Sequence, residues 1–355
     1  MVMDIQYKEG FFSAKILVLA VAAFFISGPA SAGAKDEASA ADAKALQAGD
    51  ASVVMNSSLF GLCFTSRNNG WLVGKSGAIV CTRDGGKTWT FQKSGGKLHV
   101  YDVSFCDDAH GWAVGESGII LHTANGGASW ETQQSGITGT LRAVQCLDAG
   151  TAWVAGHEGA LLKTVDGGKT WVLQTKVQDM LKQLNRKFLP SFFGLKFSDA
   201  LNGYTVGHPG IILRTTDGGE TWHQQPSGTS SILYKVAVQG NSDAWISGGE
   251  GVILRTRDAG ATWVLQTSGV SFKLNSIAFA GGNTGFAVGH KCILHTENGG
   301  ETWSKFDIDL SRWLYGISFD GSNNGWAVGD SGTMYHTEDG GKSWNLISAQ
   351  VTIQP

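Results

Sequence analysis

The sequence predicts an all-β fold, a seven-bladed β-propeller with four-stranded antiparallel blades, from three observations. One pattern, G-W-x-V-G-x-x-G-x-I-L-x-T-x-D-G-G-x-T-W, recurs seven times. Its copies follow one another at intervals of 41, 41, 51, 41, 41 and 40 residues. Twelve of the 13 tryptophans occupy two fixed columns of the pattern. The first aromatic residues of the copies are Trp71, Trp112, Trp153, Tyr204, Trp245, Phe286 and Trp326.

Each repeat contains four short apolar runs that are separated by glycine-rich turns. In the second repeat they are Val100 to Phe105, Trp112 to Val114, Ile119 to His122 and Ser129 to Gln133. Each run has the length of a strand and is bounded by turn residues. Four antiparallel strands in about 40 residues is the period of a propeller blade. A lone blade cannot bury both of its apolar faces, so we expect the blades to pack around an axis.

The second half of the pattern, T-x-D-G-G-x-T-W, is an Asp box, and we call it the third hairpin of each blade. We expect its Asp or Asn side chain to accept hydrogen bonds from backbone N–H groups across the turn. The glycines permit positive φ, and the Trp covers the hairpin with apolar area. These residues are therefore predicted to be structural. The acidic or amide positions are Asp84, Asn125, Asp166, Asp217, Asp258, Asn298 and Asp339.

The N-terminus has the pattern of a secretory signal peptide. Lys15 precedes an apolar run from Ile16 to Ile26, and Ala30-Ser31-Ala32 fits a cleavage site. The run of about 11 residues is shorter than the roughly 20 that span a bilayer, so an uncleaved anchor is the less favoured alternative. We expect a signal peptide over 1–32, a flexible Ala-rich tether over 33–57, the propeller over 58–349 and a C-terminal tail over 350–355. Export to the periplasm, or to a lumen or the exterior, follows from this. The tail can add an outer strand where the ring closes.

Composition argues against several kinds of function. The net charge of −3 gives no electrostatic case for nucleic-acid binding. Gly86-Lys87-Thr88 resembles the end of a phosphate-binding loop, but Cys81 stands where that loop needs a glycine, so no cofactor is predicted. The five cysteines do not form a regular framework, and a Cys106–Cys146 bridge between neighbouring blades stays open.

Aromatic and basic residues gather where the inner strands begin. In a four-stranded meander the first and third turns share one face, so the V-G-x-x-G turns and the crossovers lie on the other face, at the channel mouth. Aromatic side chains mixed with Arg are typical of protein-binding hot spots. A plug for the central channel is the alternative. The candidate partner-binding residues are Tyr101, Arg142, Tyr234, Arg312, Trp313 and Tyr315, with Phe193, Asn275, His99 and Lys273 nearby.

A ten-residue insertion between the third and fourth copies predicts a short helical insert at about 176–190. Apolar residues from Val177 to Phe188 recur at helical spacing, and Pro190 stops the helix. Lys182, Arg186 and Lys187 lie off the apolar stripe and are further candidates for contact with a partner or a membrane surface. An inert cover for the blade edges is the alternative.

Two further repeat positions are occupied mainly by histidine or basic residues, and each has a simpler interpretation than a binding site. His157, His208 and His290 share one repeat position, but neighbouring copies should be about 10 Å apart, whereas Zn–N bonds are about 2 Å, so no metal site is predicted. A basic row precedes the third hairpins, and we interpret it as a solvated rim or a second docking patch. Its members are His122, Lys163, Arg214, Arg255, His295 and His336.

The coupled signature G-W-x-V-G … T-x-D-G-G-x-T-W resembles the photosystem II stability and assembly factor family, a branch of the bacterial-neuraminidase-repeat propellers. The resemblance covers roughly residues 57 to 349. It implies a seven-bladed propeller that faces a lumen or the periplasm and helps membrane-protein assembly by binding partners. No cysteine for lipid attachment follows the apolar run, a departure from the family. We therefore carry over the general activity and not the photosystem client.

The sequence thus predicts a non-catalytic exported scaffold that binds a membrane protein or an assembly-complex subunit. One alternative is a glycoside hydrolase, sialidase-like or of another Asp-box type, since fold does not determine function. A sialidase-like site needs an arginine cluster and a Tyr–Glu pair, and no glutamate occupies the inner-strand row. A two-carboxylate site among Glu116, Glu158, Glu250 and Asp330 stays open, although these turn residues are expected to be solvated. Another alternative is an accessory or receptor subunit of a membrane transport system.

Overall fold

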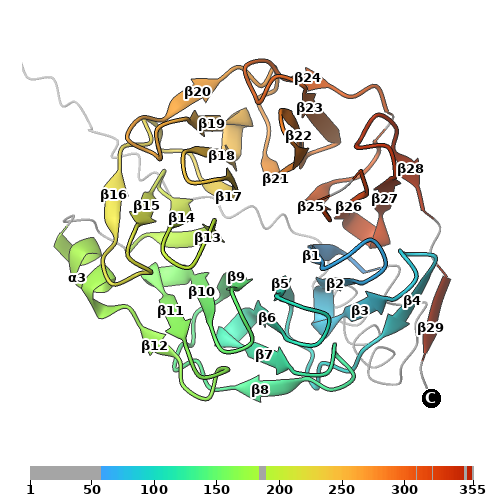
Figure 1. Ribbon diagram of the computed structural model, residues 1–355, viewed down its shortest axis with the longest axis horizontal. Helices are drawn as coiled ribbons and strands as arrows, with labels where there is room; N and C mark the ends of the chain where they lie inside the picture. The colour runs from blue at the N-terminus through green and yellow to red at the C-terminus, as the bar shows by residue number, and fades with distance from the viewer. Residues whose placement is uncertain (1–56, 184–188, 309, 322, 348–349, 354–355) are drawn as a thin grey trace, which may run out of the picture. The chain divides into compact units, whose positions relative to one another are not determined.

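The computed structural model describes residues 57–183, 189–308, 310–321, 323–347 and 350–353. Contacts divide the chain into two units, Met1–Ala38 and Ser39–Pro355, and the described residues belong to the second. They form seven sheets arranged as a seven-bladed β-propeller, which confirms the predicted fold and number of blades (Figure 1). The expected signal peptide and all but the last residue of the expected tether lie outside the described residues. Among the described helices, none is long and apolar enough to cross a membrane.

Each blade is a meander whose four strands follow one another from the innermost to the outermost. The strands are β1 (Leu59–Phe64), β2 (Gly70–Gly74), β3 (Ile79–Thr82) and β4 (Thr88–Phe91) in blade 1; β5 (Val100–Phe105), β6 (Gly111–Gly115), β7 (Ile120–Thr123) and β8 (Glu131–Gln133) in blade 2; β9 (Leu141–Cys146), β10 (Ala152–Gly156), β11 (Leu161–Thr164) and β12 (Val172–Leu173) in blade 3; β13 (Ser191–Phe197), β14 (Gly203–His208), β15 (Ile212–Thr215) and β16 (His223–Gln225) in blade 4; β17 (Leu233–Gln239), β18 (Asp243–Gly248), β19 (Ile253–Thr256) and β20 (Val264–Gln266) in blade 5; β21 (Leu274–Gly281), β22 (Thr284–Gly289), β23 (Cys292–Thr296) and β24 (Ser304–Lys305) in blade 6; and β25 (Leu314–Phe319), β26 (Gly325–Gly329), β27 (Met334–Thr337) and β28 (Asn345–Leu346) in blade 7.

The last strand of the chain returns to the first blade. β29 (Gln350–Ile353) runs parallel to β4, with Gln350 opposite Thr88 and Ile353 opposite Phe91. The predicted outer strand at the ring closure is therefore confirmed. It covers the edge of blade 1 that would otherwise expose unpaired backbone groups.

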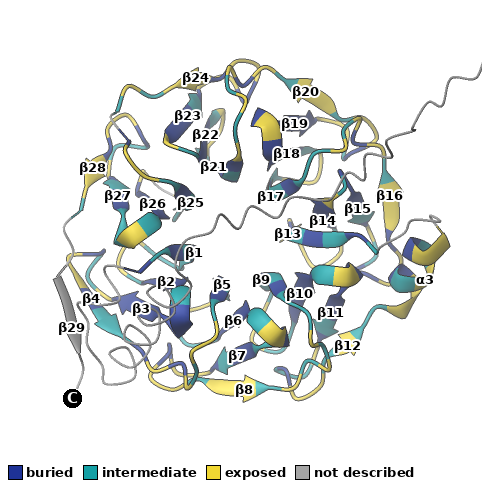
Figure 2. Ribbon diagram, turned by 180° about the vertical axis from the view of Figure 1, so that it is seen from behind, coloured by how far each residue is buried: buried dark blue, intermediate teal, exposed yellow. Residues whose placement is uncertain are grey.

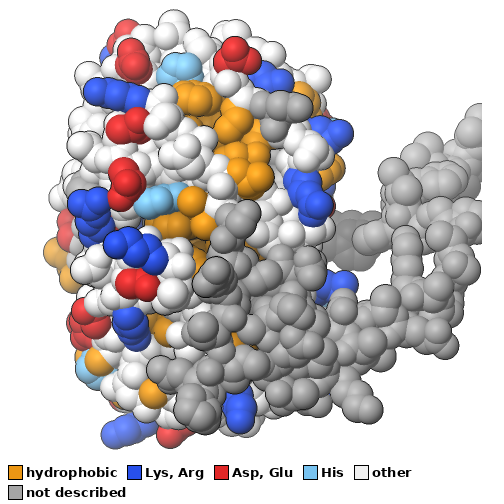
Figure 3. All heavy atoms as spheres, turned by 90° about the vertical axis from the view of Figure 1, so that its right-hand side faces the viewer, with side chains coloured by type: hydrophobic (Ala, Val, Ile, Leu, Met, Phe, Trp, Pro, Cys, Tyr) orange, Lys and Arg blue, Asp and Glu red, His pale blue; other side chains and the backbone are white. Residues whose placement is uncertain are grey.

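The apolar core lies between the blades. Seven clusters of buried side chains each join one blade to the next, and one of them unites Trp89 of blade 1 with Trp326 of blade 7. Figure 2 shows buried residues along the inner strands and exposed ones on the outermost strands and the turns. On the side of the ring that Figure 3 shows, acidic and basic side chains are interspersed along one edge. The stability of the ring thus comes from burial between neighbouring blades.

The third hairpins are closed by the predicted hydrogen bonds. In blade 1 the Thr88 backbone N–H donates to Asp84 Oδ1 over 2.9 Å, and the Thr88 hydroxyl donates to Asp84 Oδ2 over 2.7 Å. The Thr82 hydroxyl oxygen accepts from the Gly86 N–H over 2.7 Å. The same contacts recur in the other blades, with Asn in place of Asp in two of them. The acidic residues of these hairpins therefore organise the turn.

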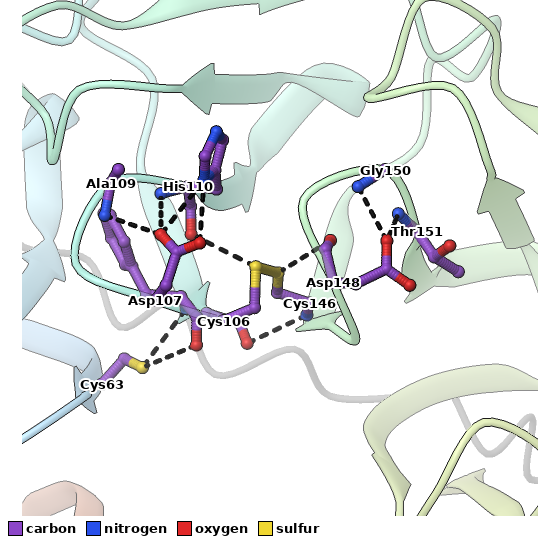
Figure 4. The surroundings of a disulfide bond; sticks show 11 residues. Cys63, Cys106, Asp107, Ala109, His110, Cys146, Asp148, Gly150 and Thr151 are labelled. Atoms are coloured by element: carbon purple, nitrogen blue, oxygen red, sulfur yellow. Dashed lines mark hydrogen bonds and ion pairs between the residues drawn. A yellow bond between two sulfur atoms is a disulfide. The ribbon is translucent and has the colours of Figure 1, made fainter.

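A disulfide bond joins blades 2 and 3 (Figure 4). Cys106 follows β5, Cys146 ends β9, and their Cα atoms are 5.3 Å apart. The pairing that the sequence left open is thus present. Cys63, Cys81 and Cys292 are free thiols, and burial raises the pKa of Cys292 to about 11.

The glycine two residues after the Asp or Asn of each third hairpin is tightly packed against the preceding blade. Gly219 has φ +86°, and a Cβ added there would overlap the ring of Trp153. Gly228 has a similar φ, +70°, but nothing lies within 4 Å of an added Cβ. The two glycines thus separate the cost of a left-handed backbone from the cost of a steric clash.

We predict that Gly219→Ala costs about 3 kcal/mol or more of unfolding free energy, because a left-handed Ala costs roughly 1–2 kcal/mol and overpacking adds about 1–3 kcal/mol. Gly228→Ala should cost only the backbone part, about 1–2 kcal/mol. Urea unfolding of both variants measures the difference. Equal losses would show that the seam between the blades tolerates the methyl group.

Acid should weaken the third hairpins. Hydrogen bonds from the Thr170 hydroxyl and N–H lower the pKa of Asp166 to about 2, and equivalent bonds lower the pKa of Asp258 to about 2. An unfolded Asp has a pKa of about 3.9, so this stabilisation is complete above about pH 4 and is lost as the pH falls toward 2. We expect the melting temperature to decline over that range in a thermal-unfolding series.

An asparagine provides the control for this effect. In blade 2, Asn125 Oδ1 accepts from the Ser129 N–H, and Asn125 Nδ2 donates to Ser129 Oγ, both over 2.9 Å, so an amide closes the hairpin without titrating. A combined variant should remain folded at pH 7 and lose stability less steeply below pH 4; an unchanged slope would assign the acid sensitivity to other groups. The substitutions are Asp166→Asn, Asp217→Asn, Asp258→Asn and Asp339→Asn.

Candidate functional site

The inner strand of every blade contains a β-bulge close to its start. The register between the first and second strands skips one residue at the same repeat position in all seven blades. A bulge leaves one residue unpaired and redirects its side chain. The residues at the bulge are Phe60, Tyr101, Arg142, Phe193, Tyr234, Asn275 and Tyr315.

Six of these side chains form a chain of contacts that we call the mouth ring: Tyr315, Phe60, Tyr101, Arg142, Phe193 and Tyr234. The Phe60 ring centroid lies 5.3 Å from that of Tyr101 and 5.5 Å from that of Tyr315. The Arg142 guanidinium carbon lies 4.0 Å from the Tyr101 centroid and 5.8 Å from that of Phe193, within cation–π range. Phe193 in turn lies 5.8 Å from Tyr234. All six side chains are half-buried, so each keeps part of its surface accessible.

Phe60 was missed by the sequence analysis, which took the row from Tyr101 onward. It links Tyr315 of blade 7 to Tyr101 of blade 2, because its ring contacts both. The signal was present in the repeat, since Phe60 precedes the G-W step of blade 1 by the same interval as Tyr101 precedes that of blade 2.

Carboxylates of the short 3₁₀ turns hold the ring tyrosines. The Tyr101 hydroxyl donates to Glu116 Oε1 over 3.3 Å, and the Tyr315 hydroxyl donates to Asp330 Oδ1 over 3.4 Å. Burial, followed by the nearby Asp330 charge, raises the pKa of Tyr315 to about 12 and keeps its hydroxyl protonated. Glu116 also accepts from the His99 N–H over 2.9 Å. These two acids were expected to be solvated; they remain partly exposed, and each also accepts a hydrogen bond from a tyrosine that the bulge brings next to it.

Arg142 is positioned by a histidine. Its Nε donates to His157 Nε2 over 3.3 Å. Burial lowers the pKa of His157, and the Arg142 charge lowers it further, so the neutral imidazole serves as the acceptor. His157 therefore orients the Arg142 guanidinium. Within the described part of the chain, no cluster of His, Cys, Asp or Glu side chains is suited to hold a metal ion.

Arg312 and Trp313 lie outside the mouth ring. Trp313 stacks on His290, with ring centroids 4.4 Å apart, and His290 also contacts Phe272 at 5.5 Å. Arg312 is exposed, and its Nη1 lies 3.5 Å from the Ser331 carbonyl oxygen. At the bulge of blade 6, Asn275 donates to the Leu314 carbonyl over 2.8 Å and does not extend the aromatic series.

The predicted helical insert is present as α3 (Thr175–Gln183), on the rim between blades 3 and 4 (Figure 1). Val177 and Leu181 are buried in the cluster between these blades, as the apolar stripe requires. Exposed Lys182 forms an ion pair with Asp179 over 3.3 Å. Arg186 and Lys187 lie outside the described residues.

The basic row before the third hairpins is neither a solvated rim nor an open docking patch. Its members lie opposite the repeat aromatics on the neighbouring strand, and His336 stacks on Trp326 with centroids 4.0 Å apart. Lys163 Nζ lies 5.2 Å from the Trp153 centroid and donates to the Gly218 carbonyl of the next blade over 2.8 Å. These side chains therefore pack within the seams between blades.

Comparisons with known proteins agree with the fold and the repeat. The family model described as photosynthesis system II assembly factor YCF48 matches residues 41–187, 130–229, 173–267 and 224–316. A solved structure described as YCF48 bound to D1 peptide is 25% identical, with a TM-score of 0.65 over 79% of this chain and 93% of that chain. YCF48 from Cyanidioschyzon merolae is 23% identical, with a TM-score of 0.67 over 79% and 96% of the two chains.

An enzyme has the same fold at a lower sequence identity. The GH74 xyloglucanase from Xanthomonas campestris is 12% identical, with a TM-score of 0.67 over 80% of this chain and 52% of that chain, which shows the fold alone. No curated protein matches the sequence.

The segments matched by the family model overlap and together extend from residue 41 to residue 316. They contain every member of the mouth ring, from Phe60 to Tyr315. More than half of the sequence is therefore matched, and the chain belongs to the photosynthesis system II assembly factor YCF48 family.

Proposed function

We propose that this chain is a non-catalytic, exported propeller scaffold that binds a segment of a partner protein at the mouth ring and so aids the assembly or stability of a membrane protein complex. The observation that carries the proposal is the ring itself. Six of the seven bulges bring half-buried aromatic side chains and one guanidinium to the same end of the channel. Aromatic residues and Arg are the side chains that contribute most binding energy at protein interfaces.

The membership of the family supports a protein partner. A relative in the same family has been solved as YCF48 bound to D1 peptide, and this chain covers most of that protein. The position of the carboxylates supports a binding role rather than hydrolysis, because Glu116 and Asp330 each accept a hydrogen bond from a ring tyrosine. They act on the ring by holding its aromatic faces in place.

We predict that Arg142→Ala weakens capture of the partner by about tenfold or more, since interface hot spots contribute about 2 kcal/mol or more. The measurement is affinity capture from detergent-solubilised membranes of the native host, followed by mass spectrometry. Arg257→Ala is the matched control, because Arg257 is exposed and pairs with Glu301 in another hairpin over 2.6 Å. It should capture the same proteins as the wild type.

Two results would contradict this function. Equal capture by the Arg142→Ala and wild-type proteins, at equal melting temperature, would place the binding surface elsewhere. Hydrolysis of a xyloglucan or sialoside that is abolished by Glu116→Gln would make the chain an enzyme.

Export has its own test. The pattern Ala30-Ser31-Ala32 predicts that the mature protein begins near Gly33. N-terminal sequencing of the protein from its native host, after separation of soluble and membrane fractions, checks this. A mature chain that retains Lys15 and the apolar run would contradict cleavage.

A further inference from the structure

The inner strands have one edge that pairs with no other strand and faces the central channel. Backbone N–H groups along such an edge need acceptors. Side chains of the preceding blade provide acceptors for some of them from two fixed repeat positions, which we call the capping positions. The observed caps are Cys63 to the Phe105 N–H (3.3 Å), Asp102 to Val144 (3.2 Å), Ser104 to Cys146 (3.0 Å), Gln145 to Phe197 (2.6 Å) and Ser276 to Ile317 (3.4 Å).

Blades 4 and 5 lack an acceptor at both capping positions. Blades 1, 3, 6 and 7 lack one at a single position, which is occupied by Gly61, Ala143, Ala278 and Gly316. Strand registers place Gly194 and Lys196 at the capping positions of blade 4, and Lys235 and Ala237 at those of blade 5. None of these side chains carries a hydrogen-bond acceptor at neutral pH. The N–H groups that they would cap belong, by the same register, to Val236, Val238, Ile277 and Phe279. The ammonium groups of Lys196 and Lys235 therefore lie on the part of the channel wall where both capping acceptors are absent.

The same wall lines a cavity of about 380 Å³ within the channel. Its lining includes Lys196, Lys235, Asp102 and Cys63, but no member of the mouth ring. The lining residues come from the later parts of the inner strands, so the cavity lies beyond the ring, toward the third hairpins. It is thus separate from the proposed partner site.

The charges of the cavity leave one ammonium uncompensated. Lys235 Nζ reaches across the channel to Asp102 Oδ2 over 3.2 Å. Lys196 lines the cavity, and its ammonium group makes no hydrogen bond or ion pair among the described residues. Burial lowers the pKa of Lys196, and the like charge of Lys235 lowers it further, while burial raises the pKa of the Cys63 thiol and keeps it neutral.

We propose that this cavity binds a small oxyanion, phosphate or sulfate, between Lys196 and Lys235. An oxyanion supplies the acceptors that the capping positions of blades 4 and 5 lack, and its charge offsets the repulsion between the two ammonium groups. Lys235 remains in contact with Asp102, so Lys196 provides the principal charge-assisted hydrogen bonds. The site does not depend on the proposed partner function.

Lys196→Gln is the decisive variant, because another blade already has a glutamine at the equivalent position. Gln145 occupies the equivalent position in blade 3 and caps the Phe197 N–H. A glutamine at 196 can cap the Val238 N–H in the same way, so the variant should fold and melt no lower than the wild type without phosphate. Isothermal titration of the full chain with sodium phosphate, and separately with sodium sulfate, should show binding that weakens by about tenfold or more in the variant.

Two further proteins complete the test. Lys97→Gln removes an exposed lysine outside the cavity and should bind phosphate as the wild type does. Asp102→Asn keeps an acceptor for the Val144 N–H and removes the only carboxylate of the lining, so it should bind phosphate more tightly than the wild type. Melting temperatures are compared at constant ionic strength, with chloride replacing phosphate. Equal stabilisation by chloride, or equal phosphate affinity in the wild type and Lys196→Gln, would overturn the proposal.

Discussion

The ring depends on the contact between the third hairpin of each blade and the blade before it. In blade 1, Trp71 Nε1 donates to the Gly126 carbonyl of blade 2 over 3.1 Å, and in blade 5, Trp245 Nε1 donates to Gly299 of blade 6 over 2.9 Å. Blade 2 uses a relay, because Trp112 Nε1 donates to Gln133, which donates to the Gly167 carbonyl of blade 3 over 2.8 Å. In these blades the hairpin satisfies a buried donor of its neighbour, and a buried donor without a partner would cost roughly 1–3 kcal/mol.

The same contact explains the composition of the hairpin. The second glycine must adopt positive φ and leave room for the preceding blade; at Gly86, a Cβ would overlap the Trp326 ring where blade 1 meets blade 7. The Asp or Asn side chain holds the turn from within, so that its carbonyl groups point outward to the neighbour. Acidic residues that resemble catalytic groups in the sequence are therefore used to close the ring.

The backbone of the inner strands is repeated in every blade, whereas the side chains that line the channel differ from blade to blade. The bulge and the two capping positions recur in every blade, but the side chains on them differ, and function follows from those differences. Aromatic residues and Arg142 at the bulges produce the mouth ring, whereas lysines at the capping positions of blades 4 and 5 produce the oxyanion cavity. The two sites lie along one channel and are supported by the same strands, which explains how a rigid scaffold can carry separate binding surfaces.

The sequence alone determined what is local and periodic: seven blades, the third hairpins with their hydrogen bonds, the helical insert and the row of residues at the starts of the inner strands. Each of these depends on residues within one repeat, so spacing and residue type are sufficient to predict it. Contacts between repeats were decided only by the tertiary structure. The Cys106–Cys146 bond joins neighbouring blades, and the Lys235–Asp102 pair crosses the channel between residues 133 positions apart. The bulge that turns Phe60 into the mouth ring, and the packing of the basic row against the repeat aromatics, likewise depend on how sheets meet, because a repeat pattern specifies each sheet but not which side chains of different sheets converge.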